Sequence, residues 1–89
     1  MRAVITVIGK DMVGILAKVS NRCADANVNI LEVTQTVLRD LFAMIMLVDI
    51  SASNLPFETL SASLKKDGAE MGLSIHVMHE DIFNSMHRI

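Results

Sequence analysis

The segment from Gly9 to Gly14 has the residue types and spacing that most suggest ligand chemistry. Its two glycines are separated as in phosphate-binding loops, but Ile15 and Leu16 stand where those loops need Lys followed by Ser or Thr. What remains is a glycine near the expected start of a helix, where unpaired backbone N–H groups and the helix dipole attract a carboxylate. Gly14 either leaves room for such a ligand or lets the helix pack closely against the sheet or a neighbouring subunit.

Histidines near the C-terminus raise the question of metal binding and catalysis. His76 and His79 are three residues apart, and such residues on a regular strand point to opposite faces, so they are not expected to share an ion. The neighbouring Glu80 and Asp81 do not change this, and no two acids have a spacing that would flank a bond. No Ser or Cys is visibly matched with a His. The sequence therefore predicts no metal site, no cofactor and no catalytic centre, and the chain is not expected to be an enzyme.

Composition narrows the classes of partner and the compartment. Hydrophobic residues make up 52% of the chain and charged residues only 20%, so a folded domain with extensive burial is expected. A net charge of −2 without a basic run excludes nucleic acid and acidic lipid as expected partners. The longest apolar run, residues 41–48, is less than half of the roughly 20 residues that span a bilayer. The lone Cys23 and the absence of a secretory signal indicate the cytoplasm.

Hydrophobic periodicity predicts the element order β-α-β-β-α-β, followed by a short terminal helix. The expected strands cover residues 3–8, 28–38, 41–48 and 73–78, and the expected helices cover 12–26, 57–71 and 80–89. Asp11 is expected to cap the first helix. Leu16 is expected to be central to the buried stripe of that helix, which comprises Met12, Ile15, Leu16, Val19, Cys23 and Ala26.

This order fits a ferredoxin-like α+β sandwich, in which a four-stranded antiparallel sheet carries two helices on one face. Its first and third strands would lie in the middle, and its opposite face would have no cover of its own. The third strand supplies that face with either Leu41, Ala43, Ile45 and Leu47 or Phe42, Met44, Met46 and Val48, depending on register. Either set would form an apolar patch that marks an interface, and the terminal helix could hide only part of it. A homodimer or a larger assembly is therefore predicted.

The stretch Gly9-Lys-Asp-Met-Val-Gly-Ile-Leu-Ala-Lys-Val19, followed by Ala26-Asn-Val-Asn-Ile30, resembles an ACT domain. ACT domains are small regulatory modules attached to many enzymes of amino-acid metabolism. In that family a strand leads into a G-x-D-x-x-G-[IL] loop and a helix, and an Asn-Ile pair opens the second strand. The resemblance covers residues 1–79, and residues 80–89 form a helical extension. The whole chain is thus similar to the free-standing bacterial ACT proteins.

The resemblance implies dimers that bind amino-acid effectors at the subunit interface, between the first loop and the start of the second strand. By position in the motif, the implied ligand-binding residues are Lys10, Asp11, Met12, Val13, Gly14 and Ile15, with Asn29 and Ile30 opposite. The Arg-Pro pair that is common in the family is Met12-Val13 here, and the usual glycine before the Asn-Ile pair is displaced. These departures leave the identity of the effector open.

Two functional hypotheses follow. In the first, the protein senses an amino acid or a similar small effector through backbone N–H groups of residues 12–15, and Asn29 adds its side-chain amide. In the second, the protein is a regulatory subunit that binds another protein through the uncovered sheet face or the terminal helix, without a small ligand.

Overall fold

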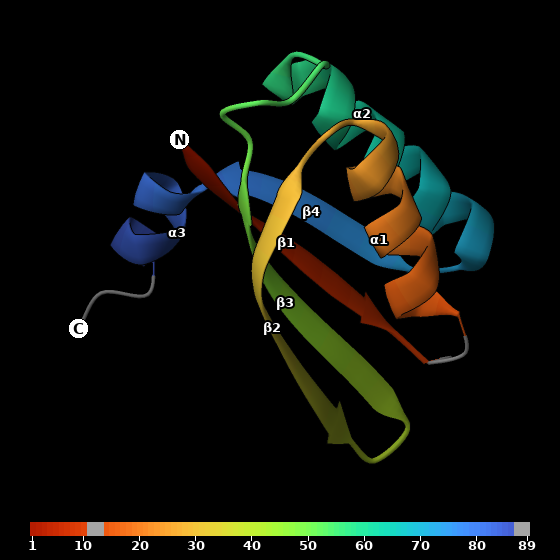
Figure 1. Cartoon of the computed structure of the whole chain (residues 1–89). Helices are drawn as coiled ribbons and strands as arrows, with labels where there is room; N and C mark the ends of the chain where they lie inside the picture. Colours follow the sequence, from red (N-terminus) through yellow and green to blue (C-terminus); the bar gives the residue numbers. More distant parts are fainter. Residues whose placement is uncertain (11–13, 87–89) are drawn as a thin grey trace.

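The elements of the fold arise where the hydrophobic pattern predicts them. The computed structural model describes residues 1–10 and 14–86. Its elements are β1 (Arg2–Gly9), α1 (Ile15–Asp25), β2 (Asn29–Leu38), β3 (Leu41–Asp49), α2 (Phe57–Met71), β4 (Ser74–His79) and α3 (Glu80–Met86) (Figure 1). This order confirms the predicted ferredoxin-like α+β sandwich with a short C-terminal helix.

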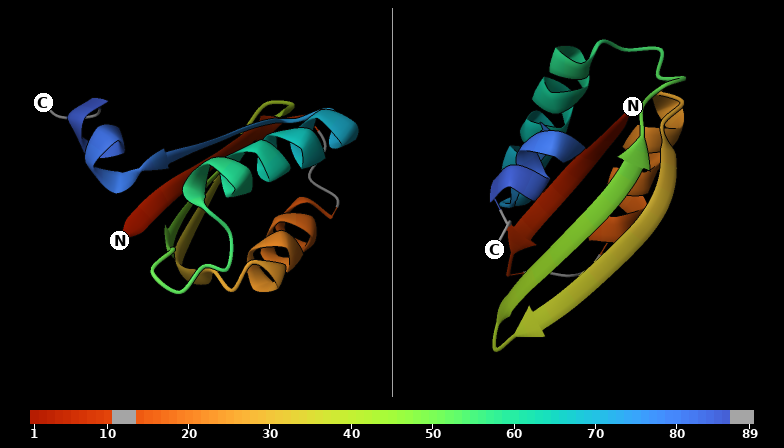
Figure 2. Two further views of the ribbon diagram at one scale, coloured as in Figure 1. Left: turned by 90° about the horizontal axis from the view of Figure 1, so that it is seen from above. Right: turned by 90° about the vertical axis from the view of Figure 1, so that its left-hand side faces the viewer.

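The four strands form one antiparallel sheet in the order β2-β3-β1-β4, so β1 and β3 lie in the middle as predicted. Both long helices lie on the same side of this sheet, and α3 lies apart from them near the beginning of β1 (Figure 2). Pairing between β2 and β3 is regular except for a bulge between Ile30 and Glu32. The sheet therefore has one face under α1 and α2 and one open face.

The hydrophobic core lies between the sheet and the two long helices. Alternate residues of the middle strands point into it and are buried, namely Ala3, Ile5 and Val7 of β1 and Phe42, Met44, Met46 and Val48 of β3. The helices contribute Ile15, Val19 and Cys23 of α1 and Leu60 and Leu64 of α2. The other alternate set of β3, comprising Leu41, Ala43, Ile45 and Leu47, consequently faces away from the helices.

The position of Leu16 differs from the prediction. Its side chain is 40% exposed, whereas Ile15 is 1% exposed. Ile15, Val19 and Cys23 follow at intervals of four residues and form the stripe that contacts the sheet. Leu16 lies about 100° further round the helix, so it falls outside the width of α1 that the sheet covers.

The start of α1 is also later than predicted. The helix begins at Ile15, and its N-cap position is occupied by Gly14 rather than by Asp11. Asp11 to Val13 lie outside the described residues. Gly14 has a φ of 75°, in the left-handed region that glycine adopts without the steric cost of a side chain. The turn into α1 thus depends on this glycine.

An ion pair joins the two long helices across 45 residues of sequence. The Arg22 guanidinium donates from Nε to Asp67 Oδ2 at 2.6 Å and from Nη2 to Asp67 Oδ1 at 2.8 Å. Asp67 is the buried charged residue of the core region, and this bidentate contact satisfies both of its oxygens. Among the described residues, no helix is both long enough and apolar enough to cross a membrane.

Candidate functional site

The first part of the predicted site lies where β1 ends and α1 begins. Lys10 is exposed immediately after β1, and Asp11, Met12 and Val13 are outside the described residues. A Cβ atom added to Gly14 would meet no described atom within 4 Å. Close packing against the sheet therefore does not explain this glycine, but its positive φ does.

The beginning of α1 presents backbone N–H groups. No side chain within residues 1–10 and 14–86 caps it, and the Lys18 N–H makes the first backbone bond of the helix, to the Gly14 carbonyl at 2.9 Å. The N–H groups of residues 15–17 precede that bond and have no partner in the preceding turn of helix. Ile15 can contribute only this backbone group, because its side chain is buried. The local chemistry suits a small anionic group such as a carboxylate.

The second part of the predicted site lies at the beginning of β2. Asn29 is exposed and pairs with Asp49 of β3, while Ile30 is half-buried and packs against the core. Two side-chain amides hold the chain on either side of this point. Asn27 Nδ2 donates to the Ala52 carbonyl at 2.9 Å, and Asn54 Nδ2 donates to the Asp25 carbonyl at 3.1 Å.

A carboxylate accompanies Asn29 that the sequence interpretation did not include. Residues that pair directly across antiparallel strands have side chains on the same face, so Asp49 lies beside Asn29. Hydrogen bonds from the side chain and the backbone N–H of Ser51 lower the pKa of Asp49. An ionised carboxylate therefore stands next to the Asn29 amide at neutral pH.

One subunit does not bring the two parts together. Gly14 precedes α1 and Asn29 follows it, so they lie at opposite ends of a helix of 11 residues (Figure 1). At 1.5 Å per residue this helix is about 16 Å long. The residues predicted on either side of a ligand can meet only if a second copy of the chain supplies one of them.

An exposed apolar edge accompanies the start of α1 and was not foreseen. Val33 and Val37 of β2 pair with Met46 and Phe42, whose side chains face the helices. Both valines are nevertheless exposed, because the β2–β3 hairpin extends beyond the helix layer (Figure 1). Beyond the bulge, β2 therefore buries neither of its faces, because it is an edge strand.

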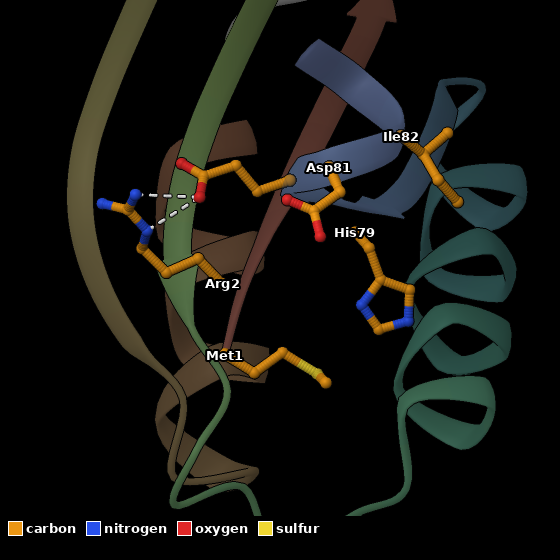
Figure 3. A pocket seen from close by; sticks show the side chains of 6 residues that line it. Met1, Arg2, His79, Asp81 and Ile82 are labelled. Atoms are coloured by element: carbon orange, nitrogen blue, oxygen red, sulfur yellow. Dashed lines mark hydrogen bonds and ion pairs between the residues drawn. The ribbon is translucent and has the colours of Figure 1, made fainter. Parts of the chain in front are cut away.

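A hollow of about 670 Å³ lies where β1 begins and β4 leads into α3, at the same end of the sheet as Asn29 and Asp49. Figure 3 shows His79 and Asp81 beside it, together with Met1, Arg2 and Ile82. Arg2 is bound to Glu80 Oε1, with Nη2 at 2.8 Å and Nε at 3.0 Å. The His79 ring stacks on Phe57 with ring centroids 4.1 Å apart. None of the predicted ligand-binding residues lines this hollow.

The structure offers little for metal or nucleophilic chemistry. His76 pairs with Thr6 on the open face, whereas His79 pairs with Ala3 on the helix side, which confirms that these histidines face apart. Within residues 1–10 and 14–86, no three His, Cys, Asp or Glu side chains lie close enough to hold a metal ion. Burial raises the pKa of the Cys23 thiol to about 11, so the thiolate is scarce at neutral pH.

Comparison with known proteins assigns this chain to a family. A model of the ACT domain family matches residues 2–78. The chain belongs to the ACT domain family. The UPF0237 protein MJ1558 of Methanocaldococcus jannaschii is 52% identical over 88 residues, which are 99% of this chain and 98% of that relative. α3 lies just beyond the matched region of this ACT domain.

Solved structures agree with this assignment. An ACT domain protein from Streptococcus pneumoniae superposes with a TM-score of 0.82 at 36% identity, over 93% of each chain. The regulatory subunit of aspartate kinase from Thermus thermophilus superposes with a TM-score of 0.66 at 25% identity. That match covers 85% of this chain and 49% of the subunit. ACT domains are generally regulatory modules that bind small ligands.

Proposed function

We propose that this ACT domain senses an amino acid, or a similar small effector with a carboxylate, at an interface between two copies of the chain. It would act by binding and not by catalysis, in the cytoplasm, with residues 1–79 as the sensing domain and 80–89 as an appended helix. The observation that supports the proposal is the start of α1 at the exposed Gly14, which no side chain of the described residues caps and whose N–H groups and dipole would favour an anion.

Twofold symmetry would complete the site. Because Gly14 and Asn29 flank opposite ends of α1, two copies placed side by side and antiparallel would bring the Gly14 end of each beside the Asn29 end of the other. The surface available for this contact is apolar, since Leu16, Val33 and Val37 are all exposed along the α1 and β2 edge. Two equivalent ligand sites would result.

The paired groups suit an α-amino acid. The N–H groups at the start of α1 would bind its carboxylate, and Lys10 would add a positive charge nearby. On the other copy, the Asp49 carboxylate would accept hydrogen bonds from the ammonium group, and the Asn29 amide would bind either group. Asp11, Met12 and Val13 would border the side chain of the ligand, and Ile30 would support Asn29 from the core.

Calorimetric titration with each of the twenty amino acids tests the proposal. We expect at least one to bind, and we expect Gly14→Asn to weaken its binding by at least tenfold. Asn tolerates the left-handed conformation but places a side chain over the start of the helix. Gly72→Asn is a matched control, because Gly72 has a φ of 74°, against 75° for Gly14, and a Cβ there would also meet nothing within 4 Å. Equal affinities for the two variants would refute the proposed site.

A second titration addresses the class of ligand. Asp49→Asn should weaken binding of the amino acid at least tenfold. The affinity for the analogue of that amino acid that lacks the amino group should stay unchanged. An equal effect on both ligands would mean that Asp49 does not contact the ammonium group.

A regulatory protein–protein interaction without a small ligand is the second candidate. Its support is the exposed apolar surface of the open sheet face and of Ile82 on α3, which is 52% exposed. In that case no amino acid would raise the melting temperature. Deletion of residues 80–89 would then abolish binding to the regulated protein, whereas a sensor would keep its amino-acid thermal shift after the same deletion.

A further inference from the structure

The open face of the sheet is divided into a covered end and a bare end. At the covered end Val4, which points away from the core helices, is only 4% exposed. A groove of about 190 Å³ lies between α3 and the sheet, and its lining includes Val4, Ile45, Leu47 and Phe83 together with the acids Glu32 and Glu80. α3 therefore covers the end of the face near the start of β1, while no element of the described residues covers the end near the β2–β3 turn (Figure 1).

The bare end has an unusual composition for a surface exposed to water. The strand register places nine residues with described side chains on it, of which Ile45 borders the α3 groove, and none of the nine carries a formal charge with His neutral, although 20% of the chain is charged. They are Thr6, Ile8, Thr34, Thr36, Leu41, Ala43, Ile45, Ser74 and His76. Ile8, Leu41 and Ile45 are each more than 40% exposed. An apolar centre with an uncharged polar rim and few charges is typical of the core of a protein interface.

We propose that this bare end binds the same surface of a second copy of the chain, so that two sheets pack face to face. The lack of charge favours this occupant, because none of the nine residues would repel its own copy and the acids Glu32 and Glu80 lie toward α3, at the covered end. The bare end also carries nothing that would select a charged partner. This contact uses the hairpin end of the sheet, whereas Asn29 and Asp49 of the effector interface proposed above lie at the other end, where β1 begins. It does not depend on that interface.

α3 sets the position of the second copy. Stacked sheets lie about 10 Å apart, and a helix is itself about 10 Å wide. α3 consequently cannot fit between two stacked sheets. It would instead contact the end of the partner sheet and so limit how far the two sheets overlap. A twofold axis through the bare end satisfies this condition for both copies, since each α3 then abuts the hairpin end of the other sheet.

The available area is sufficient for a contact of moderate strength. Four strands about 4.8 Å apart, with about 20 Å of strand left bare, give roughly 400 Å² per copy. With the flank of α3, two copies would bury roughly 1,000 Å² in total, which is the lower limit for a specific interface. We therefore expect a dissociation constant on the order of micromolar, measurable by dilution.

Sedimentation equilibrium of the full chain tests the contact. Ile8→Lys places a charge on the bare end, at an exposed side chain of the middle strand β1, without entering the core, and it should raise the dissociation constant at least 100-fold. Ala62→Lys adds the same charge at an exposed position of α2 and should leave the constant unchanged. Circular dichroism verifies that both variants fold. A wild type that stays monomeric at millimolar concentration, or equal constants for the two variants, would overturn the proposal.

Thiol labelling locates the contact independently of any disruptive variant. Thr34→Cys and Gln35→Cys introduce a thiol at adjacent exposed residues of β2 that point to opposite faces. The native Cys23 is buried and contributes no background. Raising the protein concentration from about 1 µM to 1 mM should slow maleimide labelling of Thr34→Cys at least tenfold. If only the labelling rate of Gln35→Cys decreased, the contact would lie on the helix side and the proposal would be overturned. Labelling rates of both variants that do not change with protein concentration would also overturn it.

Discussion

Replacement of Arg22 by Met should destabilise the protein by about 2–3 kcal/mol at pH 7. The variant removes two hydrogen bonds from the Asp67 carboxylate, whose side chain is only 6% exposed. Leaving one partner of a fully buried ion pair alone costs about 3–5 kcal/mol. A loss below that range is expected here because the Arg22 side chain is 36% exposed, so water can partly replace its hydrogen bonds to Asp67 in the variant. Met retains the packing of the aliphatic part of the arginine side chain.

The loss should depend on pH in a defined direction. The Arg22 hydrogen bond lowers the pKa of Asp67 in the folded state. A lowered pKa gives a stabilisation that is complete above the unfolded value of about 3.9. That stabilisation disappears as the pH falls from there through the folded pKa. In Arg22→Met the unpaired carboxylate is protonated more readily because of its burial, so the difference between the two proteins should shrink as the pH falls below about 4.

Urea denaturation followed by circular dichroism measures these differences at pH 7, 5 and 3. Protein concentration is kept constant, because self-association adds to apparent stability. Arg2→Met is a matched control, since Arg2 makes a similar pair with Glu80 but is 50% exposed. It should cost less than about 1 kcal/mol. An equal loss for Arg22→Met and Arg2→Met at pH 7, or a difference that grows on acidification, would refute the reasoning.

Three further predictions concern the core. Ile15→Ala should lower the free energy of unfolding, measured by urea titration, by about 2–5 kcal/mol. Leu16→Ala should lower it by less than about 1 kcal/mol, because the Ile15 side chain is buried and the Leu16 side chain is not. The reverse order would mean that α1 is rotated about its axis. Gly9→Ala should lower stability by about 1–3 kcal/mol, since the added methyl group would collide with the Leu73 side chain; an unchanged urea midpoint would contradict that contact. Cys23 should not react with a thiol reagent at pH 8 until urea unfolds the protein, because burial raises its pKa to about 11.

The element order followed from local patterns alone. Apolar residues at intervals of three and four predicted α1 and α2, and α2 ends at Met71 as predicted, where Gly72 follows with a left-handed backbone. The two most apolar strands, β1 and β3, proved to be the middle ones. These features depend on side-chain periodicity and on the φ angles that glycine permits, and both can be read from a single sequence.

Other features depended on which surfaces meet. Both alternate sets of β3 are apolar, so the pattern could not decide which one faces the helices. Leu16 fits the stripe of α1 as well as Ile15 does, and only the width of the sheet beneath the helix excludes it. Arg22 and Asp67 are 45 residues apart, and no local signal links them. Each of these depends on a contact between distant segments, which periodicity does not encode.

The candidate site combines both kinds of information. The glycines before α1 and the Asn-Ile pair after it indicated the family without any knowledge of the fold. Three features required the packed molecule: β2 is an edge strand whose valines extend past the helices, Asp49 stands beside Asn29, and α3 covers only one end of the open face. The physical reason is that a loop conformation depends on neighbouring residues, whereas the exposure of a side chain depends on where every other element packs.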